Sequence, residues 1–323
     1  MTKHVPVLYE EVRKMLHLQK GMTVVDATVG GGGHGRMMLA EVSPTGRVIG
    51  LDADERALSR FKTAVSSDES LTQASKEGRL VLVGSNYSDL MTVLERLNVP
   101  SVDAILADLG FSSDQIEDGA RGLSFQQNGP LDMRLDQRTT LTARDIVNTY
   151  SEQTLMDMLR AGDETEYRRI AHGIVKEREE QPIETTHQLA ELIAEVYPKR
   201  KRMTMKIHPA TKTFQALRIA VNREFDHLES FLKQALQVLH PGGRLAIITF
   251  HSGEDIRVKQ FFREVAQGCI CPPNFPVCRC GQAPKARILT KRPIVASERE
   301  IADNSRTRSA KLRVIEKLGE KPS

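Results

Sequence analysis

The stretch DATVGGGGHG, Asp26–Gly35, decides the fold. It follows a short apolar run, Met22–Asp26, that is typical of a buried strand, and it leads into a helical segment near Gly35–Val42. Glycines 30, 32 and 35 satisfy the pattern G-x-G-x-x-G, in which missing side chains let a ligand approach the backbone closely. A helix that begins at such a turn favours negative groups at its N-terminus. The unit therefore predicts a site for either a dinucleotide or S-adenosylmethionine.

Strand and helix signals alternate on the C-terminal side of this turn, as a parallel α/β sheet requires. The apolar runs are short and do not alternate with polar residues, which indicates strands covered by helices on both faces. We expect strands at Arg47–Asp52, Arg79–Ser85 and Val102–Asp108, with helices at Asp54–Val65 and Ser88–Leu97. The pattern predicts a Rossmann-like α/β core.

The alternation stops after Gly110, and a mainly helical block follows before strand signals return. We expect a helix at Glu224–Leu239, a turn at His240–Gly243, and strands at Arg244–Phe250, Arg287–Thr290 and Lys311–Ile315. The sequence thus predicts a discontinuous core, residues 1–114 and 214–323, interrupted by a helical subdomain at 115–213.

Length and composition describe an ordinary globular protein. The chain has 323 residues, of which 40% are apolar and 27% charged. No run approaches the 18 or so apolar residues of a membrane-spanning helix. The start, MTKHVPVLYEEV, lacks the apolar stretch of a secretory signal, so we expect a cytoplasmic protein.

The net charge of +4 averages over regions that differ strongly. Residues 196–223 contain eight basic side chains and no acidic one, and residues 285–323 contain eleven basic and five acidic ones. Two basic tracts on a near-neutral body favour a nucleic-acid partner, although solvated surfaces also explain them. If both tracts bind RNA, they should flank one cleft that leads to Asp108.

Two aspartates end predicted strands beside the glycine turn. Asp52 ends the second strand, where a carboxylate can accept hydrogen bonds from a ribose diol. Asp108 ends the fourth strand at the same edge of the sheet, where it suits the positive end of S-adenosylmethionine better than a pyrophosphate. A helix cap or an ion pair would also explain either residue.

The chain resembles the ribosomal RNA small subunit methyltransferase H family in motifs that run in order over nearly its whole length. The matching stretches are HVPVLYEE (4–11), DATVGGGGHG (26–35), SNYSDL (85–90), DLGFSSDQ (108–115), RGLSF (121–125), GPLDMRLD (129–136), HPATKTFQALRIAVN (208–222), PGGRLAIITFHSGED (241–255) and RTRSAKLR (306–313).

The resemblance implies a seven-stranded class I methyltransferase core with a helical insertion. It also implies S-adenosylmethionine as cofactor and methylation of N4 of a cytidine, position 1402 in standard numbering, in the decoding region of 16S rRNA. The partner would be 16S rRNA within the small ribosomal subunit, and a homodimer is compatible with the family. The cofactor positions carried over by motif are Gly32, Gly33, His34, Asp52, Tyr87, Asp108 and Gln115.

The same alignment of motifs suggests groups that act on the RNA. Asp108 is the candidate catalytic residue, and Phe111 is a candidate for stacking on the flipped base. Further candidates for RNA contact are basic or imidazole side chains, namely Arg134, Lys199, Arg200, Lys201, Arg202, His208, Lys212, Arg218, His251, Arg306 and Arg308. Each has a plainer explanation as a surface ion pair or a structural histidine.

All four cysteines fall in the segment CICPPNFPVCRC, at positions 269, 271, 278 and 280. Two C-x-C pairs are a candidate tetrahedral zinc site at Cys269, Cys271, Cys278 and Cys280, although C-x₂-C is the commoner spacing. A reduced loop or redox-labile thiols are the alternatives. The family often has no cysteines here, so the resemblance implies that methyl transfer requires no metal.

Two other functional classes stay open on the residues alone. A nicotinamide-dependent oxidoreductase would explain the glycine turn and Asp52, but not the basic tracts. A non-catalytic RNA-binding assembly factor would explain the tracts while leaving its ribosomal particles unmethylated.

Overall fold

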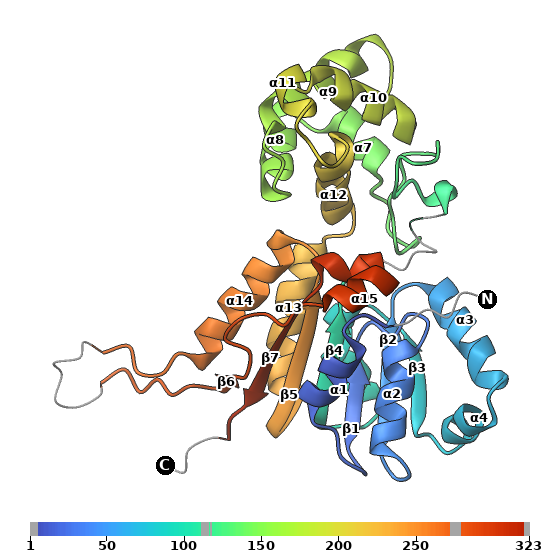
Figure 1. Cartoon of the computed structure of the whole chain (residues 1–323), viewed down its shortest axis with the longest axis vertical. Helices are drawn as coiled ribbons and strands as arrows, with labels where there is room; N and C mark the ends of the chain where they lie inside the picture. Colours follow the sequence, from blue (N-terminus) through green and yellow to red (C-terminus); the bar gives the residue numbers. More distant parts are fainter. Residues whose placement is uncertain (1–5, 111–115, 117, 272–278, 320–323) are drawn as a thin grey trace. The chain divides into compact units, whose positions relative to one another are not determined.

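A computed structural model describes residues 6–110, 116, 118–271 and 279–319 of the chain. The chain divides into two compact units. The core unit consists of residues 1–110 and 227–323, and the insert unit of residues 111–226. Figure 1 labels the elements of both units.

The core unit is built on a seven-stranded sheet with the order β3-β2-β1-β4-β5-β7-β6. Strands β1 to β5 pair in parallel, whereas β7 runs antiparallel to both β5 and β6. The strands are β1 Thr23–Asp26, β2 Arg47–Asp52, β3 Leu80–Gly84, β4 Val102–Asp108, β5 Leu239–Thr249, β6 Ala286–Ile288 and β7 Lys311–Lys317. The predicted α/β class and the seven strands are confirmed.

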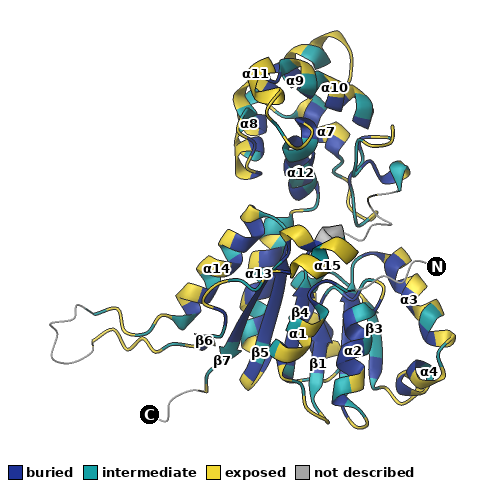
Figure 2. Cartoon of the chain, in the orientation of Figure 1, coloured by how far each residue is buried: buried dark blue, intermediate teal, exposed yellow. Residues whose placement is uncertain are grey.

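Helices cover both faces of this sheet. Neighbouring residues of one strand serve opposite faces: Val24 packs with α1 and α2, while Val25 packs with α5 and α13. Strands β1, β2, β4, β5 and β7 are accordingly buried along most of their length, whereas the edge strands β3 and β6 are only partly buried (Figure 2). The helices of this unit are α1 Tyr9–Leu16, α2 Gly33–Val42, α3 Glu55–Ser66, α4 Glu69–Lys76, α5 Leu90–Arg96, α13 Glu224–Val238, α14 Ser252–Ala266 and α15 Glu298–Asp303. The boundary between the two units lies within the first turn of α13.

Two local expectations differ from the structure. Helix α4 was not expected, and its N-cap is Asp68, whose carboxylate accepts from the backbone N–H groups of Ser70 and Leu71. The expected turn at His240–Gly243 lies inside β5 as an irregularity, because Leu239 already pairs with Val102 and Arg244 pairs with Ala104.

The insert unit has a hydrophobic core of its own, formed by apolar side chains of its helices. These helices are α7 Ala143–Thr149, α8 Glu152–Ala161, α9 Tyr167–Glu180, α10 Thr186–Val196, α11 Lys199–Arg202 and α12 Ala210–Val221. Helix α12 contributes Phe214 and Leu217 to that core, and the Asn222 side chain bonds to the backbone of Met133 and Leu135. The unit therefore extends to Asp226 instead of ending at residue 213.

Across the described parts of the chain, no helix combines the length and apolar character needed to span a bilayer.

Candidate functional site

Three aspartates meet at the carboxyl edge of the core sheet. Asp52, Asp26 and Asp108 end β2, β1 and β4, which lie side by side in that order. Carboxyl ends of neighbouring parallel strands form the usual ligand edge of open α/β sheets. The sequence predicted that these three aspartates would gather at one edge, and the strand order places Asp26 between the other two.

The glycine turn connects β1 to α2 directly above this edge. Gly32 is the N-cap of α2 with φ +80°, a conformation that side chains rarely adopt. A Cβ at Gly32 would lie 2.1 Å from the ring of Phe61 in α3. Packing alone therefore requires glycine at this position, in addition to any need of a ligand.

Asp52 holds the turn in place. Its Oδ2 accepts from the backbone N–H of Gly30 at 2.9 Å, and its Oδ1 accepts from the N–H of Asp54 at 2.8 Å. Burial raises the pKa of Asp52, and these two hydrogen bonds oppose that shift. A carboxylate has about four acceptor positions, so Asp52 retains capacity for a diol.

Asp26 is the buried member of the group, with 1% of its surface exposed. Its Oδ1 lies 3.4 Å from the backbone N of Thr28, and its buried Oδ2 has no hydrogen-bond partner. Burial raises its pKa to about 7. Its position at a strand end was visible in the sequence, but the burial that perturbs it comes from the packed sheet.

Asp108 has an even more perturbed carboxyl group. Burial, followed by repulsion from Asp26 and Glu254, raises its pKa to about 8. Its backbone N–H donates to the hydroxyl of Thr28 at 2.7 Å, which ties β4 to the glycine turn. Its Oδ1 is buried without a partner. A strongly shifted carboxyl at a ligand edge is a candidate functional group.

His34 lies beneath these carboxyl groups, 6% exposed. Its Nε2 donates to the carbonyl oxygen of Val7 at 3.0 Å, and its Nδ1 lies 3.7 Å from Asp108 Oδ2. Burial lowers the pKa of His34 to about 4, so the ring is neutral near pH 7. The ring therefore packs within the core, with its unprotonated Nδ1 facing Asp108.

Tyr87 begins a 3₁₀ turn, Tyr87–Asp89, just after β3. Its ring packs edge-on against Phe231 of α13, with 5.2 Å between the ring centroids. Gly33 follows Gly32 at the start of α2, where an added Cβ would lie 2.4 Å from Pro6. Contact of either residue with the cofactor stays a prediction. Gln115 and Phe111, also predicted for this site, lie outside the described residues.

The candidate RNA-binding residues divide between the units. His251 is in the core unit, where its Nδ1 accepts from the N–H of Glu254 as the N-cap of α14. Arg308 is exposed in the same unit, and the side chain of Arg306 is outside the described part. The remaining candidates belong to the insert unit, namely Arg134, Lys199, Arg200, Lys201, Arg202, His208, Lys212 and Arg218.

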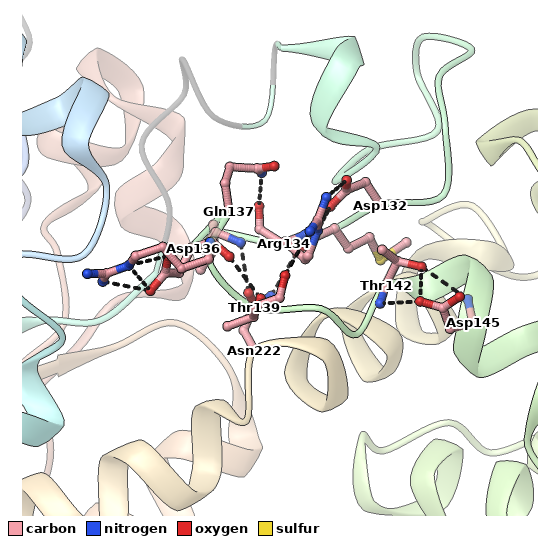
Figure 3. Close-up of polar contacts among 11 residues, drawn as sticks. Asp132, Arg134, Asp136, Gln137, Thr139, Thr142, Asp145 and Asn222 are labelled. Carbon is pink, nitrogen blue, oxygen red and sulfur yellow. Dashed lines mark hydrogen bonds and ion pairs between the residues drawn. The ribbon is translucent and has the colours of Figure 1, made fainter.

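Arg134 and Arg218 are committed to carboxylates. Arg134 makes a two-pronged contact with Asp132 at 2.8 and 2.7 Å and donates to the carbonyl of Thr139 (Figure 3). Arg218 makes the same kind of bidentate ion pair with Glu224, through hydrogen bonds of 2.8 and 2.9 Å. The ion pairs that the sequence left open as a plainer explanation for these two arginines are therefore present, and such paired guanidinium groups order the loops around them.

The four basic residues of α11, Lys199–Arg202, are exposed. Lys201 pairs with Glu166, and Arg202 donates to the carbonyl of Ala194 at 2.7 Å. Further along, Lys212 donates to the carbonyl of Asp163 at 3.0 Å. Within the basic tract at residues 196–223, the exposed positive charge is therefore concentrated at α11.

His208 lies at the N-terminal side of α12. Its ring packs against that of Phe125, 4.7 Å between centroids, and its Nδ1 accepts from the N–H of Ala210 at 3.2 Å. Both contacts are structural. Binding of RNA by the exposed imidazole of His208 stays a prediction.

The edge of the sheet fits a cationic ligand. Two buried carboxylate oxygens, Asp26 Oδ2 and Asp108 Oδ1, have no partner, and repulsion from Asp26 contributes to the raised pKa of Asp108. A positive group placed between them would relieve both the desolvation and the repulsion. A pyrophosphate would add negative charge instead, so the donor set favours S-adenosylmethionine over a dinucleotide.

Comparison with known proteins places the chain in one family. The MraW methylase family matches residues 1–318. Relatives named ribosomal RNA small subunit methyltransferase H come from Syntrophotalea carbinolica and Thermomicrobium roseum. Both are 46% identical over 318 residues, which cover 98% of this chain and 98% and 94% of the relatives. A solved rRNA methylase from Streptococcus thermophilus has a TM-score of 0.39 and 11% identity, covering 96% of this chain and 94% of that one.

The fold is assigned from the strand order of the sheet, which is that of class I methyltransferases. The acidic ligand edge agrees with the family match over nearly the whole chain. The chain belongs to the MraW methylase family and is an S-adenosylmethionine-dependent methyltransferase of the ribosomal RNA small subunit methyltransferase H group.

Proposed function

We propose that this methyltransferase modifies N4 of the cytidine in the decoding region of 16S rRNA, acting on the assembled small ribosomal subunit. The relatives' shared name supports the ribosomal RNA substrate. The observation that carries the site assignment is Asp108, with its buried, unpartnered Oδ1 at the end of β4.

An exocyclic amine is a weak nucleophile because its lone pair is delocalised into the pyrimidine ring. The cofactor supplies an electrophilic methyl group on a positively charged sulfur. The protein must hold the amine in line with that group and accept hydrogen bonds from its N–H groups as positive charge develops on nitrogen. Asp108 Oδ1 is the acceptor for this role, and the ionised carboxylate is its active form.

Loss of a proton from N4 completes the transfer. In the ligand-free protein the pKa of Asp108 is about 8, and a bound cationic cofactor favours the ionised carboxylate, which can then receive that proton and pass it to water. Asp26 and Asp52 lie on the cofactor side of the edge, where Asp52 anchors the glycine turn through the N–H of Gly30.

The RNA-binding surface of the insert unit is centred on α11. Four consecutive basic side chains at the surface suit phosphate contacts, which hold the substrate without reading its sequence. The expectation that this tract and the C-terminal tract flank one cleft leading to Asp108 stays a prediction, as do dimerisation and the cytoplasmic location.

Nucleoside mass mapping of 16S rRNA from a strain that lacks this gene tests the proposal. We expect N4-methylation in the decoding region to disappear and to return with the wild-type gene. An Asp108→Asn gene should restore the protein but not the methyl group. Persistence of the methyl group in the deletion strain would refute the substrate assignment.

Two further outcomes separate the other classes. Binding of NAD in place of S-adenosylmethionine would indicate an oxidoreductase. Normal binding to 30S particles, with no methylation by the wild-type protein on any form of the RNA, would indicate an assembly factor. Comparing free 16S rRNA with 30S particles in the same assay identifies the assembly state of the substrate.

A further inference from the structure

A cluster of thiols lies in the core unit, away from the strand edge that holds the three aspartates. Residues 267–285 join α14 to β6, and their described parts contain neither helix nor strand. The described parts extend away from the sheet side by side (Figure 1). Three cysteines occupy them, Cys269 and Cys271 on the outgoing side and Cys280 on the returning side. We define these three residues as the thiol cluster.

The three sulfur atoms converge on one point. All three Sγ atoms lie within 4.8 Å of one another. The Sγ atoms of Cys269 and Cys280 are 3.7 Å apart, far beyond the length of a disulfide bond. Two thiolates bound to one zinc ion at about 2.3 Å in tetrahedral geometry are separated by about 3.8 Å. The observed separation, which in the metal-free protein is a thiol–thiol hydrogen bond, matches that of two zinc ligands, so a zinc ion fits between the sulfur atoms with little movement.

Backbone N–H groups point at two of these sulfur atoms. The N–H of Arg279 donates to Cys271 Sγ at 3.3 Å, and that of Gln282 donates to Cys280 Sγ at 3.5 Å. Hydrogen bonds of this kind stabilise the negative charge of a thiolate and fix its direction.

The ligand atoms that this segment offers determine which metal it favours. Residues 267–285 contain no aspartate, glutamate or histidine, so sulfur is the only strong ligand type in the segment. Thiolates favour Zn²⁺ and other thiophilic ions over Mg²⁺ or Ca²⁺. The basic side chains of Arg279 and Lys285 offset the negative charge of three thiolates on one divalent ion.

We propose that Cys269, Cys271 and Cys280 bind one Zn²⁺ ion that ties the outgoing and returning sides of this segment together. Each thiol releases its proton on binding, so three protons leave as three zinc–sulfur bonds form. The described parts of this connection contain neither helix nor strand, and a metal cross-link supplies order that packing does not. The site is independent of methyl transfer.

Metal analysis of the full-length protein, purified under reducing conditions, tests this inference. We expect one zinc ion per chain by mass spectrometry of the elements. Cobalt titrated into the metal-stripped protein should give the near-ultraviolet absorption of cobalt–thiolate bonds and the visible bands of tetrahedral cobalt. Absence of both zinc and the cobalt–thiolate band would overturn the proposal, as would an iron–sulfur spectrum.

Substitutions identify the ligands. Cys269→Ser, Cys271→Ser and Cys280→Ser should each weaken cobalt binding by at least about tenfold, while Gln282→Ala keeps it because that residue contributes its backbone N–H. Circular dichroism must show unchanged helix content in all four proteins. Wild-type affinity in the serine variants would overturn the assignment, and so would a disulfide between Cys269 and Cys280 in the reduced preparation.

Proteolysis tests the cross-link itself. Without zinc, a protease should cut between Ala266 and Ala286 faster than in the zinc-bound protein, and added zinc should restore resistance in wild type but not in Cys280→Ser. Equal cutting rates with and without zinc would refute the structural role.

Discussion

His34 Nδ1 and Asp108 Oδ2 face each other at 3.7 Å with lone pairs opposed. The other ring nitrogen of His34 is committed to the Val7 carbonyl as donor, so a neutral ring turns an unprotonated Nδ1 toward the carboxyl group. An ionised Asp108 would add its own negative charge to this pair. Protonation of Asp108 or a nearby cation relieves the conflict. Burial of the carboxyl group and repulsion from Asp26 and Glu254 raise its pKa to about 8.

Asp108→Asn should stabilise the cofactor-free protein at alkaline pH. A carboxyl group with a raised pKa in the folded state destabilises the fold increasingly as pH rises from its ordinary value near 3.8 to about 8. Asparagine removes that cost and can donate to His34 Nδ1. We expect a gain on the order of 1–3 kcal/mol near pH 8.5 that shrinks toward pH 4.

Thermal unfolding across this pH range measures the effect, and methyl transfer by the same variant should be lost. A variant destabilised by the same amount at every pH would show that Asp108 is not protonated in the folded protein. Asp103→Asn, at the other end of β4, tests whether any neutralised aspartate on this strand has the same effect.

His34→Gln should flatten the acid side of the stability profile. The folded pKa of His34 lies near 4, below the ordinary 6.5, so its contribution to stability is present above about pH 6.5 and is lost as pH falls through 4. Glutamine can still donate to Val7 but does not titrate. Chemical denaturation at several pH values provides the measurement, and an unchanged slope between pH 6.5 and 4 would contradict the assignment.

Gly32→Ala should destabilise the core unit by about 2–4 kcal/mol, because the new methyl group meets Phe61 at a position with φ +80°. Gly31→Ala is the matched control, since a Cβ at Gly31 has no neighbour within 4 Å. The double variant Gly32→Ala with Phe61→Leu should recover part of the loss. Equal stability of the two alanine variants would contradict this explanation.

Lys199→Gln with Arg200→Gln should weaken binding to 16S rRNA and reduce its salt dependence. Each lost phosphate contact lowers the slope of log affinity against log salt by about 0.7–0.9. Arg144→Gln is the control, an exposed arginine of the same unit paired with Glu184. Filter binding at several salt concentrations measures the slope. If the control and the double variant behave alike, α11 is not the RNA surface.

The strands and the glycine turn followed from local sequence. Their apolar runs and turn residues act over a few neighbours, so β2 and β4 were predicted with their observed bounds. The gathering of the aspartates at one sheet edge also followed, because strand ends of a parallel sheet lie on one side. Their order along that edge came from the pairing of the strands. Helix α4 was missed although its N-cap, Asp68, is a local signal, and the irregular start of β5 was missed because it depends on pairing with β4.

The sequence by itself determined the fold class, the glycine turn and the carboxylates that end its strands. Tertiary structure alone decided how these groups behave. Phe61, from another helix, makes glycine obligatory at position 32, and the folded core gives Asp108 and His34 their shifted pKa values. Burial and the approach of groups distant in sequence set the electrostatic free energy of a side chain, and local sequence contains neither quantity.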